Sequence, residues 1–191
     1  MRLGPTPRAR RLSQGVVITA FYGALLLVAV GIGAARHHAD VFLVGAGPPR
    51  GLFVSALGGL AMGGVAVFFS RLVTRRLQWA RVLHQEFHAL VHQLGSVDIF
   101  LLALSSSVAE EAFFRGALQP MVGVVPQAVL FAALHFRPRP RFYPWTAMSL
   151  GVGMLFGLFT LWRGDLCMAI VAHFTINVAN LSYIARTELR T

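Results

Sequence analysis

Glu110, Glu111 and Arg115 are ionisable residues inside an otherwise apolar stretch of this 191-residue chain. A charged side chain at the centre of a bilayer costs roughly 2.5–3.5 kcal/mol on insertion scales, so such residues mark functional sites by default. Glu111 and Arg115 are four residues apart, and we expect them to neutralise each other on one helical face. Glu110 is turned about 100° away and has no charged residue four positions before or after it. Glu110 is therefore the first candidate for chemistry.

Three further polar side chains, His135, His173 and Asn177, lie inside apolar helical stretches of the second half of the chain. His173 and Asn177 are one helical turn apart and are predicted to share a face. With a helix rise of about 1.5 Å per residue, these side chains and Glu110 lie at depths in the membrane that agree within about 10 Å. We therefore expect them to share one cavity.

These residue types are sufficient to hydrolyse an amide bond without a covalent intermediate. A carboxylate in a low-dielectric cavity holds a proton more readily than in water and can act as general base toward water. One histidine can orient that water or donate a proton to the leaving amine. An asparagine amide with a second histidine can donate hydrogen bonds to a developing oxyanion.

The composition indicates an integral membrane protein. Of the residues, 56% are hydrophobic and only 13% are charged, against about a quarter in soluble domains. All 17 Lys and Arg positions are arginine, and the arginines lie between the apolar runs. This placement is typical of membrane-flanking charges and disfavours a nucleic-acid partner despite the net charge of +10. The single cysteine, Cys167, excludes an intrachain disulfide and a multi-cysteine metal site, and we expect it to be inert.

The apolar runs predict an all-α polytopic membrane helix bundle with about six transmembrane helices and one amphipathic surface helix. A run of about 20 apolar residues is long enough to cross a bilayer of about 30 Å. The predicted spans are residues 16–35, 51–70, 97–118, 122–136, 142–162 and 166–185. The predicted surface helix, residues 71–95, has Leu83, Phe87, Leu90 and Leu94 at helical spacing, with arginines and histidines on its other face.

The chain is expected to divide into four units. These are an Arg-rich cytoplasmic tail (1–14), two membrane helices with the amphipathic helix (15–96), a core with the polar set (97–185) and a short cytoplasmic tail (186–191). Arginines are concentrated in alternate connections, so the positive-inside rule places both termini in the cytoplasm. The Arg-only, Ala- and Gly-rich composition is typical of a high-GC bacterium, and we expect the inner (cytoplasmic) membrane.

Three motifs in order resemble those of the CPBP family, whose members include the CAAX prenyl endopeptidases and bacterial Abi-type proteins and are intramembrane glutamic proteases. The motifs are Glu-Glu-x-x-Phe-Arg-Gly at 110–116, Phe-x-x-x-His at 131–135 and His-x-x-x-Asn at 173–177. Each motif alone is weak, but three in this order, each within an apolar span, are specific. The resemblance covers residues 97–185, which is then the catalytic core.

The resemblance implies roles for all six polar residues. Glu110 is implied to activate water with the assistance of His135, and His173 and Asn177 to form the oxyanion site. Glu111 and Arg115 are implied to be supporting groups. No cofactor and no metal are implied. The implied partners are a membrane-anchored protein or peptide substrate, cut near its C-terminus, and the lipid bilayer.

Alternatives from other classes stay open at this point. A zinc metalloprotease could use Glu110, His135 and His173 as ligands, although the chain has no His-Glu-x-x-His motif. A non-catalytic membrane protein, either a carrier or a peptide-immunity protein, is the other alternative, although carriers usually show internal repeats and none is visible.

Two other sets of side chains in the sequence are assigned no chemistry. His84, His88 and His92 fall on one helical face, where a solvated surface is favoured over a metal site. Residues 105–107 are serines without a base arrangement, which disfavours serine catalysis.

Overall fold

The computed structural model describes residues 7–37, 40–44 and 51–189. The regular elements in these ranges are α1 (Pro7–Ala35), α2 (Leu52–Arg76), α3 (Gln78–Val91), α4 (Ser96–Glu111), the π-helix η1 (Ala112–Leu118), α5 (Gln119–Val122), α6 (Val124–Leu134), the 3-10 helix η2 (Pro140–Phe142), α7 (Tyr143–Arg163) and α8 (Cys167–Arg186). Within the same ranges, β pairing is limited to one bridge between Leu43 and Asp165. The predicted all-α class is confirmed.

Four helices are long and apolar enough to cross a membrane: Val16–Ala35, Leu52–Arg76, Pro140–Arg163 and Cys167–Arg186. The count reaches five when Gln78–Val91 and Ser96–Val122, which are bent by 108° relative to each other, are taken as one broken span. The predicted span at 122–136 holds the eleven-residue helix α6, which is about 17 Å long and too short to cross a bilayer. A helical membrane bundle is confirmed, but the count of six is not.

Two helix boundaries differ from the sequence prediction. α1 begins at Pro7, inside the predicted tail, because proline is well suited to the first helical turn, where its missing N–H is not needed. α2 continues to Arg76, and the extended backbone of Leu77 separates it from α3. The surface helix therefore starts at Gln78 and not at residue 71. Residues 1–6 of the predicted tail lie outside the described residues, and the division into four units stays a prediction.

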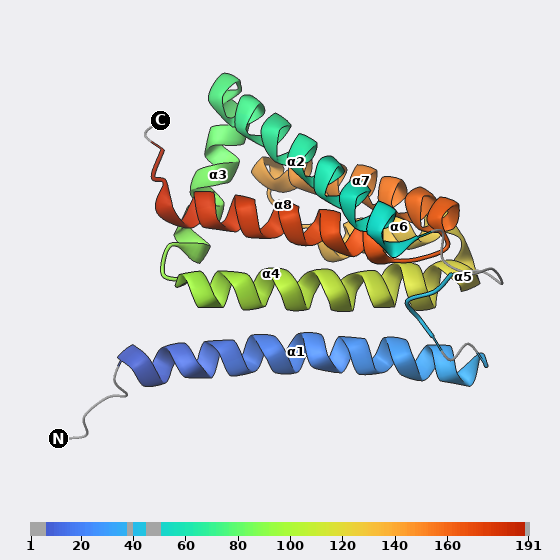
Figure 1. The fold of residues 1–191 in the computed structure, drawn as a ribbon. Coiled ribbons are helices and arrows are strands. Elements are labelled where there is room, and N and C mark those ends of the chain that lie inside the picture. Colours follow the sequence, from blue (N-terminus) through green and yellow to red (C-terminus); the bar gives the residue numbers. More distant parts are fainter. Residues whose placement is uncertain (1–6, 38–39, 45–50, 190–191) are drawn as a thin grey trace.

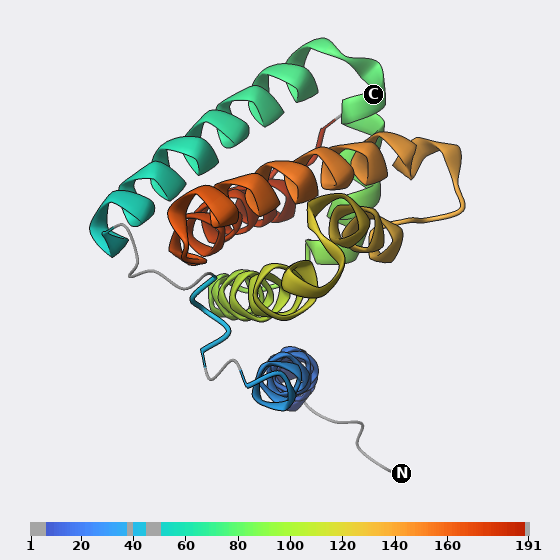
Figure 2. The ribbon, with the colours of Figure 1, turned by 90° about the vertical axis from the view of Figure 1, so that its right-hand side faces the viewer.

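The helix α8 lies in the middle of the bundle. It packs against α2, α3, α4 and α7, while α6 packs against α7 (Figure 1). α1 runs along α4 and η1 at the outer edge, as the view turned by 90° also shows (Figure 2). The start of α1 and the end of α8 lie at the same end of the bundle as α3 (Figure 1). The helix with two of the predicted site residues, His173 and Asn177, is thus held from several sides.

Glycines allow α2 to approach α8 closely. A Cβ atom added to Gly59 would lie 2.6 Å from the carbonyl oxygen of Met168, and one added to Gly63 would lie 2.7 Å from Cβ of Thr175. A Cβ atom on Gly64 would meet nothing within 4 Å. Gly59 and Gly63 thus permit close helix packing on the face of α2 that meets α8.

The turn between α7 and α8 is fixed by buried polar side chains. Gly164 adopts the left-handed conformation (φ 77°) that ends α7. The hydroxyl of Ser55 donates to Asp165 Oδ2 at 2.9 Å and accepts from Arg163 Nε at 2.9 Å. These bonds join the start of α2 to the turn that precedes α8. They therefore fix the position of α8 along the long axis of the bundle.

Replacing Gly63 with leucine should lower the thermal stability of the protein in detergent. The new side chain would collide with Thr175, and overpacking of this kind costs about 1–3 kcal/mol. The matched control is Gly64→Leu, which should unfold at the wild-type temperature because its side chain meets open space. Equal melting temperatures for the two variants would contradict the packing of α2 on α8.

The two ends of the bundle should lie on opposite sides of the membrane. The bridge between Leu43 and Asp165 brings two connections together at one end, whereas Arg141 forms an ion pair with Glu86 of α3 at the other. The positive-inside rule predicts that the Arg141 end is cytoplasmic. Reporter fusions after Asp40 and after Arg141 should therefore give opposite readouts, and the same readout from both would refute this topology.

Candidate active site

The paired glutamates lie where α4 passes into a π-helical turn. α4 ends at Glu111, and η1 covers Ala112–Leu118. On a regular α-helix, every fourth residue is rotated by about 40°, so Arg115 and Gln119 would drift away from the side that Glu111 faces. The π-helix closes its hydrogen bonds one residue later and holds more residues per turn. Glu111, Arg115 and Gln119 are all buried in the bundle, although the sequence pattern gave no sign of the π-helix.

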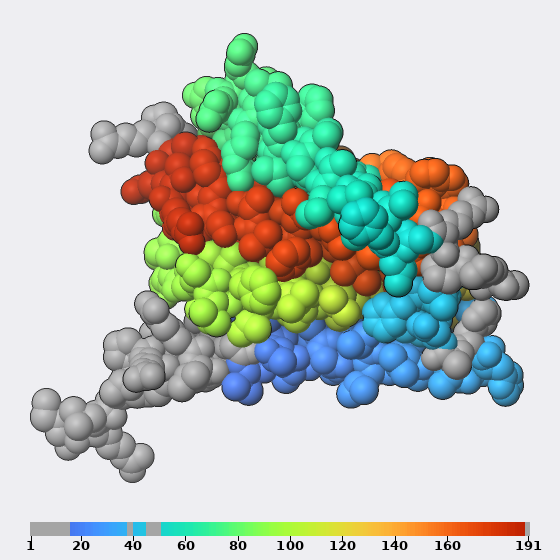
Figure 3. Space-filling view, viewed as in Figure 1, coloured from blue at the N-terminus to red at the C-terminus, as the bar shows by residue number. Residues whose placement is uncertain are grey.

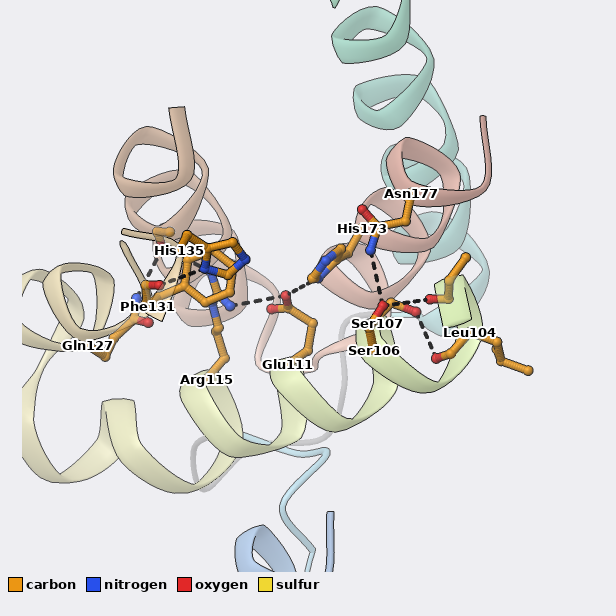
Figure 4. A network of polar contacts seen from close by, with 12 residues as sticks. Leu104, Ser106, Ser107, Glu111, Arg115, Gln127, Phe131, His135, His173 and Asn177 are labelled. Carbon is orange, nitrogen blue, oxygen red and sulfur yellow. Dashed lines mark hydrogen bonds and ion pairs between the residues drawn. The ribbon is translucent and has the colours of Figure 1, made fainter. Parts of the chain in front are cut away.

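Glu111 is held between Arg115 and His173. Both side chains of the Glu111–Arg115 pair are 0% exposed. Arg115 donates to Glu111 Oε1 at 3.0 Å, and Nδ1 of His173 is 2.8 Å from the same oxygen (Figure 4). Because the carboxylate can only accept, the Nδ1 atom of His173 carries the proton. The predicted pairing of Glu111 with Arg115 is confirmed, and the contact with His173 is an addition that helical spacing alone did not reveal.

The buried guanidinium of Arg115 is also surrounded by π-faces. It lies 4.5 Å from the centroid of the Phe131 ring and 5.5 Å from that of Phe156. Such positions over aromatic rings are attractive for a cation, especially away from water. Arg115 further donates a long bond, 3.5 Å, to the carbonyl of Gly153 in α7. The positive charge is thus compensated from α4, α6 and α7.

Two buried amides extend this polar group along α7. Gln127 donates to the carbonyl of Gly153 and Gln119 to that of Gly157, each at 3.0 Å. A Cβ atom on Gly157 would lie 2.6 Å from Oε1 of Gln119, so only glycine leaves room for this contact. The sequence analysis did not single out these glutamines, although an amide inside an apolar helix was an available signal.

His173 and Asn177 both face α4, as predicted from their spacing. Nδ2 of Asn177 donates to Oγ of Ser106 at 3.1 Å (Figure 4), and the Ser106 hydroxyl donates to the carbonyl of Ala103 in its own helix. Ser105 and Ser107 likewise donate to backbone carbonyls one turn earlier. Ser106 is therefore a hydrogen-bond partner of the candidate site residue Asn177. The sequence analysis had assigned no role to the three serines.

His135 lies immediately after the end of α6. Its Nδ1 atom is 2.7 Å from the carbonyl of Phe131, and its ring is 4.4 Å from the Phe131 ring and 5.1 Å from that of Trp145. Phe131 also contacts the ring of His173 at 6.4 Å. Figure 4 shows the two histidines on either side of Glu111 and Arg115.

Glu110 faces another helix, α1. The side chain of Tyr22 in α1 is close enough to interact with it, and its Oε2 atom is buried without a partner among the described residues. Its negative charge still acts on Arg115. Among the described residues, Glu110 forms no direct hydrogen bond with His135 or His173, so the structure does not join the expected base to the histidines. The argument from helical spacing considered partners within one helix, and Tyr22 is 88 positions earlier in the chain.

The histidines of α3 have a structural arrangement that the sequence did not predict. His84 is buried and lies 2.7 Å from the carbonyl of Thr187, and His88 lies 2.6 Å from that of Ile184. These carbonyls are at the C-terminal end of α8, where helical partners are missing. The predicted solvated face is therefore wrong for His84, while His92 is exposed. In the part of the chain that is described, no three His, Cys, Asp or Glu side chains are arranged to hold a metal ion.

Comparison with known proteins agrees with the motifs in the polar centre. Residues 92–179 match the family model described as type II CAAX prenyl endopeptidase Rce1-like. The resemblance to the CPBP family is thus confirmed. The chain is also similar to the uncharacterized protein YpbD of Bacillus subtilis (strain 168), with 38% identity over 79 residues. That match covers 41% of this chain and 41% of the relative. No solved structure matches the chain.

The CPBP-like region, residues 92–179, holds every side chain that the motifs singled out. It includes Ser106, Gln119 and Gln127, which the structure adds to the buried polar group. It begins after α3 and leaves out α1, so the contact between Tyr22 and Glu110 joins the region to a helix outside it.

Glu111→Gln should destabilise the protein, because it leaves Arg115 buried with a weakened partner. Removing one member of a buried ion pair typically costs about 3–5 kcal/mol. The double variant Glu111→Gln with Arg115→Met should recover part of this loss, since it removes the uncompensated charge. Thermal unfolding in detergent of the two variants and the wild type measures the effect. A Glu111→Gln variant as stable as the wild type would contradict this account of the pair.

Proposed function

We propose that this integral membrane protein is an endopeptidase that hydrolyses a peptide bond of a membrane-anchored protein or peptide. The observation that carries the proposal is the buried contact of Glu111 with His173, at 2.8 Å, inside a region that matches CAAX prenyl endopeptidases. Each buried ion costs several kcal/mol to remove from water. A carboxylate, an imidazole and a guanidinium gathered in a membrane bundle therefore support a chemical role.

Glu110 is the proposed general base. Oε1 of Glu111 already accepts from Arg115 and His173, so the charge of Glu111 is committed to two donors. Oε2 is buried without a partner in both glutamates among the described residues, but Glu110 is paired with no cation and has only the neutral Tyr22 as a neighbour in α1. A carboxylate in this state can accept a proton from water. Because Glu110 and His135 are not in direct contact, their cooperation in this proposal runs through the water that they activate.

His173 and Asn177 are the proposed oxyanion site. Asn177 has two amide N–H donors, one of which goes to Ser106, so the second is available to a developing oxyanion. When both ring nitrogens of His173 carry a proton, Nδ1–H is directed to Glu111 and Nε2–H is the second donor. Arg115 balances the charge of Glu111 and keeps it in place. In this proposal Glu111 and Arg115 act through His173, as positioning residues.

The contact between Glu111 and His173 also favours a second assignment of the base. Glu111 would hold the proton on Nδ1 of His173, which leaves Nε2 free to take a proton from water. A carboxylate orients a histidine in this way in serine proteases. Glu110 would then be dispensable for hydrolysis, so the two assignments make opposite predictions for the Glu110→Gln variant.

Glu110→Gln should lower turnover by at least about a hundredfold, the usual contribution of a general base. The melting temperature should change little, since glutamine keeps the size of the side chain and an acceptor for Tyr22. Mass spectrometry of the membrane proteomes of wild-type and Glu110→Gln cells should reveal a protein whose C-terminal segment stays uncut in the variant. A peptide spanning that cut is then the substrate for purified protein. Identical proteomes would overturn the proposed activity.

Two further experiments test the second assignment of the base and the metalloprotease alternative. An active Glu110→Gln protein together with an inactive His173→Ala protein of normal stability would favour the second assignment. Exhaustive treatment of the wild-type protein with a chelator should leave turnover unchanged. Loss of activity that zinc restores would instead favour a metalloprotease with Glu110, His135 and His173 as ligands.

The proposed location is the inner membrane of a bacterium, with both termini in the cytoplasm. It is supported by the arginine distribution and by the position of the start of α1 and the end of α8 at the α3 end of the bundle (Figure 1).

A further inference from the structure

The helix α1 is closely packed against the two elements that carry the glutamates. Ala29 of α1 is 0% exposed and packs in one cluster with Ala112 and Ala117 of η1. Small residues at such a contact let helices approach closely in a membrane. On the face shown in Figure 3, the surfaces of α1 and α4 meet along their shared length. Side chains of α1 that face α4 are therefore within reach of Glu110.

Tyr22 brings a hydroxyl group to this interface. It is partly buried, whereas its neighbour Phe21 is 64% exposed and lies on the lipid side of α1. Tyr22 is seven residues, or about two helical turns, before Ala29, so it lies on the face of α1 that packs against η1 and α4. A buried tyrosine hydroxyl usually finds a hydrogen-bond partner, and the group with which Tyr22 interacts is the carboxylate of Glu110. The Oε2 atom of Glu110 is buried without a partner among the described residues.

We propose that Tyr22 is a positioning residue for Glu110, and that α1 is thereby part of the catalytic machinery. The hydroxyl donates to one carboxylate oxygen of Glu110 and leaves the other to accept the proton of the attacking water. The inference rests on the proposed function, in which Glu110 is the general base. It extends the site beyond the CPBP-like region, since Tyr22 is 70 positions before residue 92.

Two effects of the hydroxyl are expected to matter for catalysis. A hydrogen bond donated to a carboxylate favours its charged form, which is the form that acts as a base. The bond also fixes the direction of the free oxygen, and misplacement of a reacting group by about 1 Å can cost a hundredfold in rate. Tyr22 does not touch the substrate in this account, so it should influence the rate of the chemical step and not binding.

Tyr22→Phe should lower kcat by about tenfold and leave KM nearly unchanged, since the lost bond acts on the base. Phe21→Leu is the matched control: it changes the same helix on its lipid side and should leave kcat and KM unchanged. A Tyr22→Phe variant with a normal kcat, or one in which KM changes and kcat does not, would overturn the positioning role.

A double-mutant cycle tests the contact without using activity. Glu110→Met removes both acceptor oxygens at similar volume. Tyr22→Phe should lower the melting temperature in detergent by a few degrees in the wild-type background and by less than half of that in the Glu110→Met background. Equal losses in both backgrounds would overturn the contact. If the two substitutions are coupled but the protein cleaves no substrate, the contact between Tyr22 and Glu110 stands. The proposed function would then be overturned, and the positioning role of Tyr22 with it.

Discussion

One carboxylate oxygen, Oε1 of Glu111, receives both a guanidinium and an imidazole, at 3.0 and 2.8 Å. Buried charges must be compensated by close partners, and much of the bundle's interior is arranged to provide them. Arg115 has two aromatic rings and a carbonyl of α7 around it. The glycines of α7 leave space for the amides that continue the polar group. Four helices are thus fixed relative to one another by a single charge that none of them could bury alone.

The two neighbouring glutamates differ because they face different helices. Glu111 points to α8 and is committed to two donors, whereas Glu110 points to α1 and meets one neutral hydroxyl. One of them stabilises the bundle through strong charge pairing, and the other keeps the lone pairs that proton transfer needs. This difference follows from the step of about 100° between adjacent residues of a helix. It explains how a repeated residue type can serve two purposes in one turn.

Much of this arrangement could be predicted from the sequence, where local spacing decides it. The four apolar spans, the pair of Glu111 with Arg115 and the shared face of His173 and Asn177 all follow from helical periodicity. The number of spans differs from the prediction, because the helix that follows Gly123 has only eleven residues and because α3 and the helix after it are bent by 108° relative to each other. The π-helix, the contact of Tyr22 with Glu110 and the role of His84 at the end of α8 depend on tertiary contacts. Periodicity within one segment carries no information about those contacts.

The position of α1 has a consequence for how the protein is made. α1 leaves the ribosome before its packing partners α4 and η1, which come from residues 96–118, so α1 can enter the bilayer before they are made. When α4 follows, the hydroxyl of Tyr22 is already in the membrane near the position that Glu110 will take. Inserting a carboxylate among lipid chains is costly, and a partner that is already present lowers that cost at the step where it arises. α1 thus eases the insertion of the helix that carries both glutamates.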